Sequence, residues 1–117
     1  MATRLFRQAA QQGSSEAQDL LGSIYQEGLT GRQDWGEAAA WFLKAAQQGN
    51  VPAQTSLGKM YRQGQGVKQD YVEAYKWLKL AQLQGAKDVE AELKACSTSM
   101  TRDQIEAAEM QVKQLQK

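Results

Sequence analysis

Two pairs of carboxylates have the spacing that general acid–base chemistry could use. Asp34 and Glu37 lie three residues apart, and Asp70 and Glu73 repeat this arrangement. On a helix, such a spacing puts both side chains on one face, where one carboxyl group could donate a proton and the other accept one. The same spacing also suits a helix start, where an aspartate accepts from free N–H groups and a glutamate lies near the positive end of the helix dipole. Because the pattern recurs at a fixed interval, we expect helix capping rather than catalysis.

Other reactive side chains are few. The chain of 117 residues has no histidine and a single cysteine, Cys96. This composition excludes histidine-based catalysis, histidine metal ligands and an internal disulfide. Residues 64–66 read Gly-Gln-Gly but lack the Gly-Lys-Ser/Thr of a phosphate-binding loop. We therefore expect no catalytic residue, no metal and no cofactor.

The charge pattern gives no reason to expect nucleic acid or a membrane as a partner. Trp77 lies between Lys76 and Lys79, and an aromatic ring among basic side chains can stack on bases. The net charge is only +1, however, and no apolar run is long enough to cross a bilayer. We expect Trp77 to be a packing residue. The sequence shows no signal peptide and a single cysteine, which leaves the compartment open between the cytoplasm and the periplasm.

A repeat of 36 residues organises the chain. When the sequence is shifted by this length, many residues fall on residues of their own kind. The matched pairs include Gly13/Gly49, Ala17/Ala53, Gln18/Gln54, Leu21/Leu57, Gly22/Gly58, Tyr25/Tyr61, Asp34/Asp70, Trp41/Trp77 and Ala45/Ala81. A period of this length is typical of helical hairpins that stack into a solenoid.

These residues resemble the Sel-1-like repeat, a relative of the tetratricopeptide repeat. Its pattern runs Ala-x-x-x-Leu-Gly-x-x-Tyr-x-x-Gly-x-Gly-Val-x-x-Asp-x-x-x-Ala-x-x-Trp-x-x-x-Ala-x-x-Gly, and residues 53–85 match it throughout. Residues 17–49 match except that Thr30-Gly31 replaces Gly-Val, so we expect an altered turn there. The resemblance implies an all-α, right-handed α–α solenoid of stacked helical hairpins, a tetratricopeptide-like superhelix with a C-terminal capping helix.

The repeat divides one domain, residues 1–117, into hairpins. Gly49 can take a positive φ and end one helix, Asn50 can cap the next, and Pro52 suits its first turn. The repeated glycine, Gly22 and Gly58, indicates a helix crossing that is too close for a β-carbon. The expected parts are the second helix of a partial repeat (1–13), repeat one (14–49), repeat two (50–85), a partial repeat (86–99) and the capping helix (100–117).

The third repeat is degenerate. We expect a helix from Ala86 to Cys96 and a loop from Cys96 to Ser99, with Lys94 in place of the repeated glycine. Asp88 and Glu92 would share a solvated face. Thr101 and Gln104 then form a capping box. The last helix would bury a narrow stripe made of Ile105, Ala108, Val112 and Leu115. That stripe favours a cap, with a dimeric coiled coil as the alternative.

The first helix would expose apolar side chains. Leu5 aligns with Trp41, and Phe6 aligns with Phe42, so the chain begins in mid-repeat. An excised piece of a longer array is favoured over a worn N-terminal cap, because array ends normally carry a polar face. We expect weak self-association through this helix.

The resemblance places the first helix of each hairpin on a concave face, where a partner would bind. The residues expected to line this groove, opposite the apolar stripe, are Glu16, Asp19, Ser23, Gln26, Thr55, Lys59, Arg62, Asp88 and the small Ala91. This groove is acidic at one end and basic at the other. Lys59 and Arg62 lie about one turn apart and could both reach one carboxylate. A solvated helix face is the alternative interpretation.

The sequence therefore favours a non-enzymatic scaffold or adaptor that binds a peptide or protein segment, with an acidic segment as the expected match. The alternative is a small-ligand binder or hydrolase of the cell envelope. Some cysteine-rich relatives were described as binding or hydrolysing β-lactams, and this chain lacks their cysteine pairs.

Overall fold

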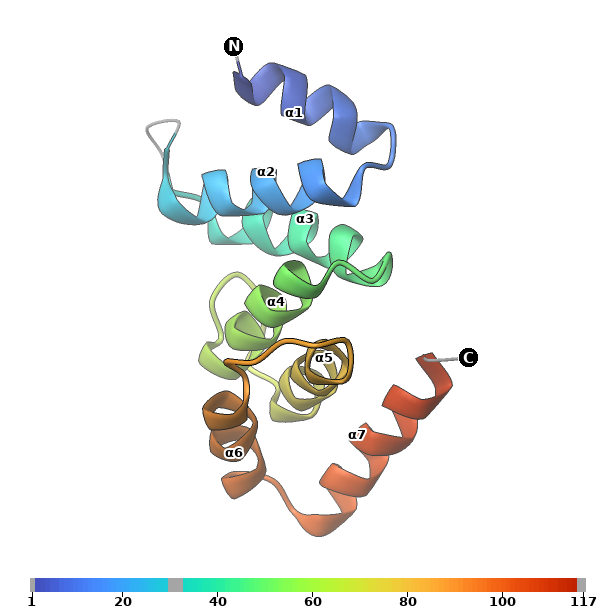
Figure 1. Ribbon diagram of the computed structural model, residues 1–117. Helices are drawn as coiled ribbons and strands as arrows, with labels where there is room; N and C mark the ends of the chain where they lie inside the picture. The colour runs from blue at the N-terminus through green and yellow to red at the C-terminus, as the bar shows by residue number, and fades with distance from the viewer. Residues whose placement is uncertain (1, 30–32, 116–117) are drawn as a thin grey trace.

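The computed structural model describes residues 2–29 and 33–115, and these residues form helices and connecting turns without a strand. The helices stack in zigzag order along a long axis, with overall extents of 47 × 29 × 22 Å (Figure 1). The altered turn expected at Thr30-Gly31 lies outside the described residues. The helices are α1 (Ala2–Gln11), α2 (Ser15–Glu27), α3 (Trp35–Gln47), α4 (Val51–Gln63), α5 (Tyr71–Leu83), α6 (Glu90–Thr98) and α7 (Arg102–Leu115).

The carboxylate pairs cap helices. Asp34 Oδ1 accepts from the Glu37 N–H at 3.0 Å, and Asp70 Oδ1 accepts from the N–H groups of Val72 and Glu73 at 3.0 and 3.1 Å. Each aspartate thus satisfies donors that a helix start leaves free. Both side chains act at the start of the second helix of a hairpin, which confirms the capping interpretation.

The repeated glycines lie where the two helices of a hairpin cross. A β-carbon on Gly22 would come within 2.6 Å of the Phe42 ring, and one on Gly58 within 2.6 Å of Leu78 Cγ. The carbonyl oxygen of Ala74 would also lie 3.2 Å from a β-carbon on Gly58. The contacts at 2.6 Å are too short for real carbon atoms, so glycine lets α2 approach α3 and lets α4 approach α5.

Apolar side chains from neighbouring helices form the hydrophobic core. Trp41 and Trp77 are only 8% and 5% exposed, as their repeat position predicts. Trp41 packs with Ala17 and Leu21 of α2, whereas Trp77 joins the cluster that α3, α4 and α5 share. Each tryptophan therefore contributes to the packing between helices, and nucleic-acid stacking by Trp77 is excluded because its ring is covered.

Buried glutamines join consecutive helices. Gln18 Nε2 donates to the Ala10 carbonyl at 2.9 Å, and Gln18 Oε1 accepts from Gln48 Nε2 at 2.8 Å. Gln54 repeats both bonds one repeat later, donating at 3.1 Å to the Ala46 carbonyl and accepting at 3.4 Å from Gln84. Each buried glutamine thus connects its own helix to the preceding helix and to the end of the following helix.

The degenerate third repeat differs from the expectation. α6 begins at Glu90 rather than at Ala86, and it continues to Thr98. The loop expected from Cys96 to Ser99 is therefore wrong. The hydroxyl groups of Ser97 and Thr98 both donate to the Lys94 carbonyl, at 3.1 and 2.7 Å, which supports the last turn.

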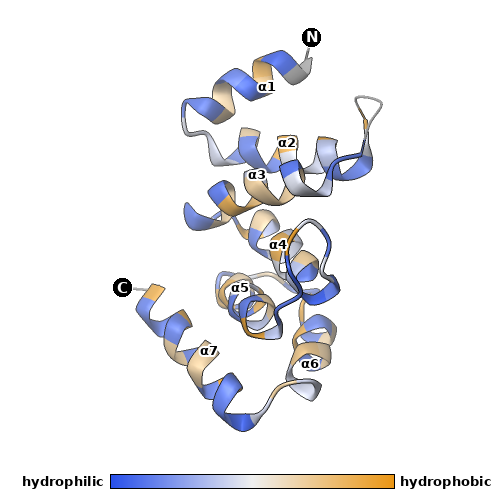
Figure 2. Cartoon of the chain, turned by 180° about the vertical axis from the view of Figure 1, so that it is seen from behind, coloured by the Kyte–Doolittle hydropathy of each residue, from blue (hydrophilic) through white to orange (hydrophobic). Residues whose placement is uncertain are grey.

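The last helix packs on α5 and diverges from α6 (Figure 1). Lys94 occupies the place of Gly22 and Gly58, so a close crossing between α6 and the following helix is blocked. Ile105 and Ala108 pack instead near Tyr75 of α5, and the capping box forms in both directions between Thr101 and Gln104, at 2.9 and 3.1 Å. Of the expected stripe, Ala108 and Val112 are buried and Ile105 is half-buried, whereas Leu115 is 56% exposed, so the expectation was wrong for Leu115. Hydrophobic and hydrophilic positions alternate along α7 (Figure 2).

Replacing Trp77 by alanine should lower the free energy of unfolding by about 3–5 kcal/mol, because it removes a large buried side chain and leaves a cavity. Chemical denaturation followed by circular dichroism measures the loss. Trp35→Ala, at a half-buried position, is the control and should cost less. An unfolding midpoint that equals that of the parent would contradict the core position of Trp77.

Gly58→Ala should destabilise the chain by about 1–3 kcal/mol, because the added carbon would overlap Leu78. The matched control is Gly36→Ala, since a β-carbon at Gly36 meets only Asp34 Oδ1 at an ordinary 3.5 Å. That variant should be neutral or slightly stabilising, because alanine favours helix. Equal melting temperatures for the two variants would remove the close-crossing explanation.

Candidate partner-binding groove

The expected groove residues lie on α2, on α4 and at the start of α6, which follow one another along the solenoid (Figure 1). Asp88 is an exception to the expected helix, since it precedes the first residue of α6. The exposed members are Glu16, Lys59, Asp88 and Ala91. The half-buried members are Asp19, Ser23, Gln26, Thr55 and Arg62.

Arg62 does not stand free in the groove. Its Nε forms an ion pair with Glu92 Oε2 of α6, and both side chains are mostly covered. The expectation that Glu92 lies on a solvated face is therefore wrong. The cause is the stacking of the repeats, which brings the last turn of α4 against the first turn of α6. Lys59 remains the exposed cation of α4 in the groove.

Asp19 lies on the neighbouring helix α2, at the repeat position that Thr55 occupies on α4. It is half-buried, and loss of water around the carboxylate raises its pKa above the usual value. No lysine or arginine in the described part of the chain forms an ion pair with it. A cationic group brought in by a partner would therefore relieve the cost of burying this charge.

Both groove helices end in the same way. Gln33 Nε2 donates at 2.7 Å to the Gln26 carbonyl at the end of α2, and Gln69 Nε2 donates at 2.8 Å to the Arg62 carbonyl at the end of α4. Each glutamine thus bonds back to the helix that precedes it. The repeat period contains this signal, because Gln33 and Gln69 are 36 residues apart.

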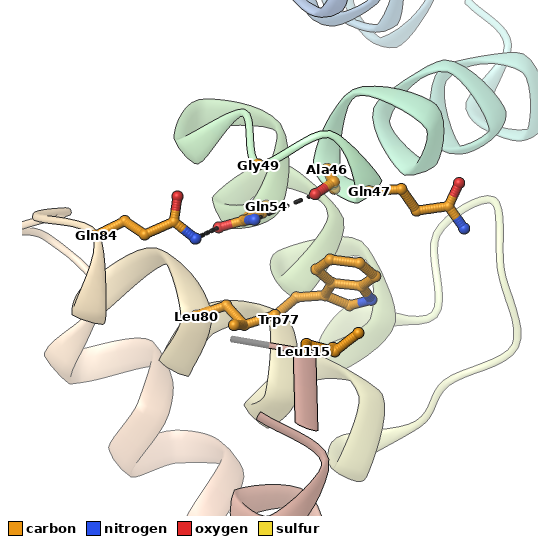
Figure 3. Close-up of a pocket in the computed structure, with 8 residues that line it drawn as sticks. All are labelled: Ala46, Gln47, Gly49, Gln54, Trp77, Leu80, Gln84 and Leu115. Carbon is orange, nitrogen blue, oxygen red and sulfur yellow. Dashed lines mark hydrogen bonds between the residues drawn. The ribbon is translucent and has the colours of Figure 1, made fainter. Parts of the chain in front are cut away.

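A separate cavity of about 330 Å³ lies at the junction of α3, α4 and α5, with Leu115 of α7 at its edge (Figure 3). Trp77 and Leu80 form an apolar wall, and the Gln54–Gln84 hydrogen bond crosses its polar side. It is lined by no acid or base. The indole N–H group of Trp77 is buried and has no hydrogen-bond partner in the described residues. The same holds for Trp41 one repeat earlier, so the unpaired indole N–H is a feature of the repeat and not of this cavity alone. Sequence reasoning missed the cavity, which depends on where α7 ends.

The described residues contain no group of side chains that could hold a metal ion. Among the described helices, none is both long and apolar enough to cross a membrane.

Cys96 should react slowly with thiol reagents in the folded chain. Burial raises the pKa of its thiol to about 11, and the residue is fully covered. At pH 7 only about one thiol in ten thousand would then be ionised. Iodoacetamide labelling followed by mass spectrometry should accelerate sharply in denaturant, where the pKa returns to its ordinary value. Equal rates in native and denaturing buffer would show that the thiol is open to solvent.

Comparisons with known proteins agree with this architecture. The Sel1 repeat matches residues 1–14, 15–50 and 51–85. The chain superposes on the crystal structure of c5321, a protective antigen present in uropathogenic Escherichia coli strains displaying an SLR fold, with a TM-score of 0.90 and 35% identity over 97% of this chain and 25% of that one. It also superposes on a Sel1 repeat protein from Oxalobacter formigenes, with a TM-score of 0.75 and 44% identity over 77% of this chain and 26% of that one. No curated protein matches the chain.

The chain thus spans about a quarter of the length of these two solved relatives. Sel1 repeat proteins generally act as protein–protein interaction scaffolds and are typically non-enzymatic. Because the matched repeats account for most of the sequence, and both relatives share its stacked hairpins, the chain belongs to the Sel1 repeat family.

Proposed function

We propose that the chain is a non-enzymatic scaffold that binds a segment of another protein along the groove face of α2 and α4. One observation supports this most directly: Asp19 is a half-buried carboxylate with no ion-pairing cation among the described residues. The sequence pattern predicts that it shares a stripe with Lys59, which is exposed. A half-buried carboxylate without a cationic neighbour is typical of a site that a binding partner completes.

The groove favours a segment with both charges. A basic side chain of the partner would lie over Asp19 and Glu16, and an acidic one over Lys59. Arg62 contributes less than the sequence suggested, because an incoming carboxylate must compete with Glu92 for its guanidinium. Lys59 is therefore the principal anchor for an acidic group, and its ammonium is free to approach a partner.

The groups that could have carried chemistry have structural roles. Asp34 and Asp70 are engaged as helix caps, and the Cys96 thiol is buried in the core. This supports binding rather than turnover as the task of the surface, in line with the general behaviour of the family.

Lys59→Glu should weaken binding to a partner recovered by pull-down about fivefold or more, which corresponds to roughly 1 kcal/mol. Calorimetric titration measures the change, and the loss should grow at low salt, where screening is weak. The melting temperature should stay near that of the parent, since surface substitutions usually change stability by less than about 0.5 kcal/mol.

The matched control is Lys68→Glu, which makes the same charge change at an exposed residue of the loop before α5. It should bind the partner as the parent does. If Lys59→Glu binds as tightly as Lys68→Glu, the groove is not the binding surface. Arg62 is a poor probe, because its replacement would also strand Glu92.

A further inference from the structure

Helices α5 and α6 pack against each other (Figure 1), and a hollow of about 550 Å³ opens along their contact. Its buried apolar lining is formed by Tyr75 of α5 and Leu93 of α6, each 8% exposed. Three charged side chains also line it, namely Lys79 of α5 and Glu90 and Lys94 of α6. None of these residues belongs to the groove face of α2 and α4.

The contact between α3 and α4, one repeat earlier, shows how this hollow acquires its character. The corresponding hollow there measures about 240 Å³, and its lining includes Leu43, Leu57 and Tyr61. At the contact of α5 with α6, Lys79 takes the place of Leu43, and Ser97 takes the place of Tyr61. The first replacement brings a charge to the junction of two repeats, and the second removes an aromatic ring from it.

A loop also covers the earlier hollow. Gly66 and Val67, which follow α4, belong to its lining. After α6, residues 99–101 lead directly into α7, which packs on α5. The lining of the larger hollow comes from α5 and α6, and the loop cover of the earlier junction is not repeated there.

The ammonium group of Lys79 is half-buried beside this hollow, and its recorded acceptor is a neutral one. Its Nζ donates to Gln82 Oε1 at 3.3 Å. Neither Lys79 nor Lys94 forms an ion pair with a carboxylate in the described part of the chain. A partly dehydrated ammonium gains most from a charged acceptor. An anion placed between the two lysines would therefore supply an acceptor that the described chain does not.

The other side chains of the lining limit the ligand to one negative charge and favour an apolar body. Glu90 would repel a second carboxylate. The hydroxyl group of Tyr75 donates to Glu109 Oε2 of α7 at 3.4 Å, so its ring remains as an apolar surface beside Leu93. A molecule with one carboxylate and a short apolar body matches this combination of groups.

We propose that the hollow between α5 and α6 binds a small monocarboxylic acid. The carboxylate bonds to the ammonium groups of Lys79 and Lys94, and the apolar body lies on Tyr75 and Leu93. A volume of about 550 Å³ is within the range of small-molecule sites. Because the site shares no side chain with the groove face of α2 and α4, it is independent of the proposed function.

The test titrates phenylacetate into the isotope-labelled full chain at neutral pH and follows the amide shifts by nuclear magnetic resonance. The shifts should change at Lys79, Leu93 and Lys94. Phenylacetamide has nearly the same shape without the charge. It should bind at least about tenfold more weakly, because charge-assisted hydrogen bonds are lost.

Lysine variants identify the anchors. Lys79→Met keeps an apolar stem and removes the charge, so it should weaken phenylacetate binding at least about tenfold. Lys94→Met should weaken binding as well, and its melting temperature should stay near that of the parent because the residue is exposed. The matched control is Lys68→Met, at an exposed residue of the loop before α5, which should bind as the parent does.

Ser97→Tyr restores the residue of the earlier junction and tests the shape of the hollow. The added ring should fill the space and abolish phenylacetate binding, while circular dichroism shows a folded chain. If this variant does not fold, Lys94→Met decides the question, since an exposed lysine is not needed for folding.

Equal binding of phenylacetate and phenylacetamide would overturn the proposal, as would equal binding by Lys79→Met and Lys68→Met. Shift changes confined to α2 and α4, or no shift change with phenylacetate, would overturn it too. The peptide acetyl-Gly-Glu-Phe-amide adds one more outcome. If it shifts the amides of the hollow and phenylacetate does not, the hollow belongs to a protein interface and the small-acid site is wrong.

Discussion

The whole stack depends on one steric constraint, the close crossing of two helices at a residue without a side chain. At Gly22 and Gly58 the facing side chains fill the space that a β-carbon would need. Each hairpin then brings its tryptophan into contact with its neighbours. Where lysine replaces this glycine at position 94, the hairpin no longer closes, and α7 packs on α5 instead. In the described residues, glycine at this position accompanies the two closed hairpins and lysine accompanies the open one.

The opened third hairpin changes what holds α6. Without a second helix at its side, α6 relies on the ion pair between Arg62 and Glu92 and on the small cluster around Cys96. The ion pair consumes a cation that the groove would otherwise offer. The same ion pair therefore holds α6 against α4 and neutralises one cation of the proposed groove.

Much of this could be predicted from spacing alone. Contacts within one repeat produce the caps at Asp34 and Asp70, the buried tryptophans and the glycine crossings. The sequence contains this repeat twice, so each of these features appears at two positions 36 residues apart. The extent of α6 could not, because serine and threonine occur both in loops and at helix ends, where their hydroxyl groups can bond to a carbonyl of the preceding turn, as in Ser97 and Thr98. The pairing of Arg62 with Glu92 was missed because it depends on how one hairpin is placed on the next. The same holds for the cavity beside Leu115.

The buried glutamines have a consequence for how the chain comes apart. Gln18 bonds to α1 and to Gln48, the residue after α3, and Gln54 bonds to α3 and to Gln84, the residue after α5. If one hairpin were to open alone, the neighbouring glutamine would keep a buried amide without a partner, which costs about 1–3 kcal/mol. Opening of one hairpin therefore raises the free energy of the neighbouring repeat as well. Such nearest-neighbour coupling makes a short array unfold as one cooperative unit rather than repeat by repeat.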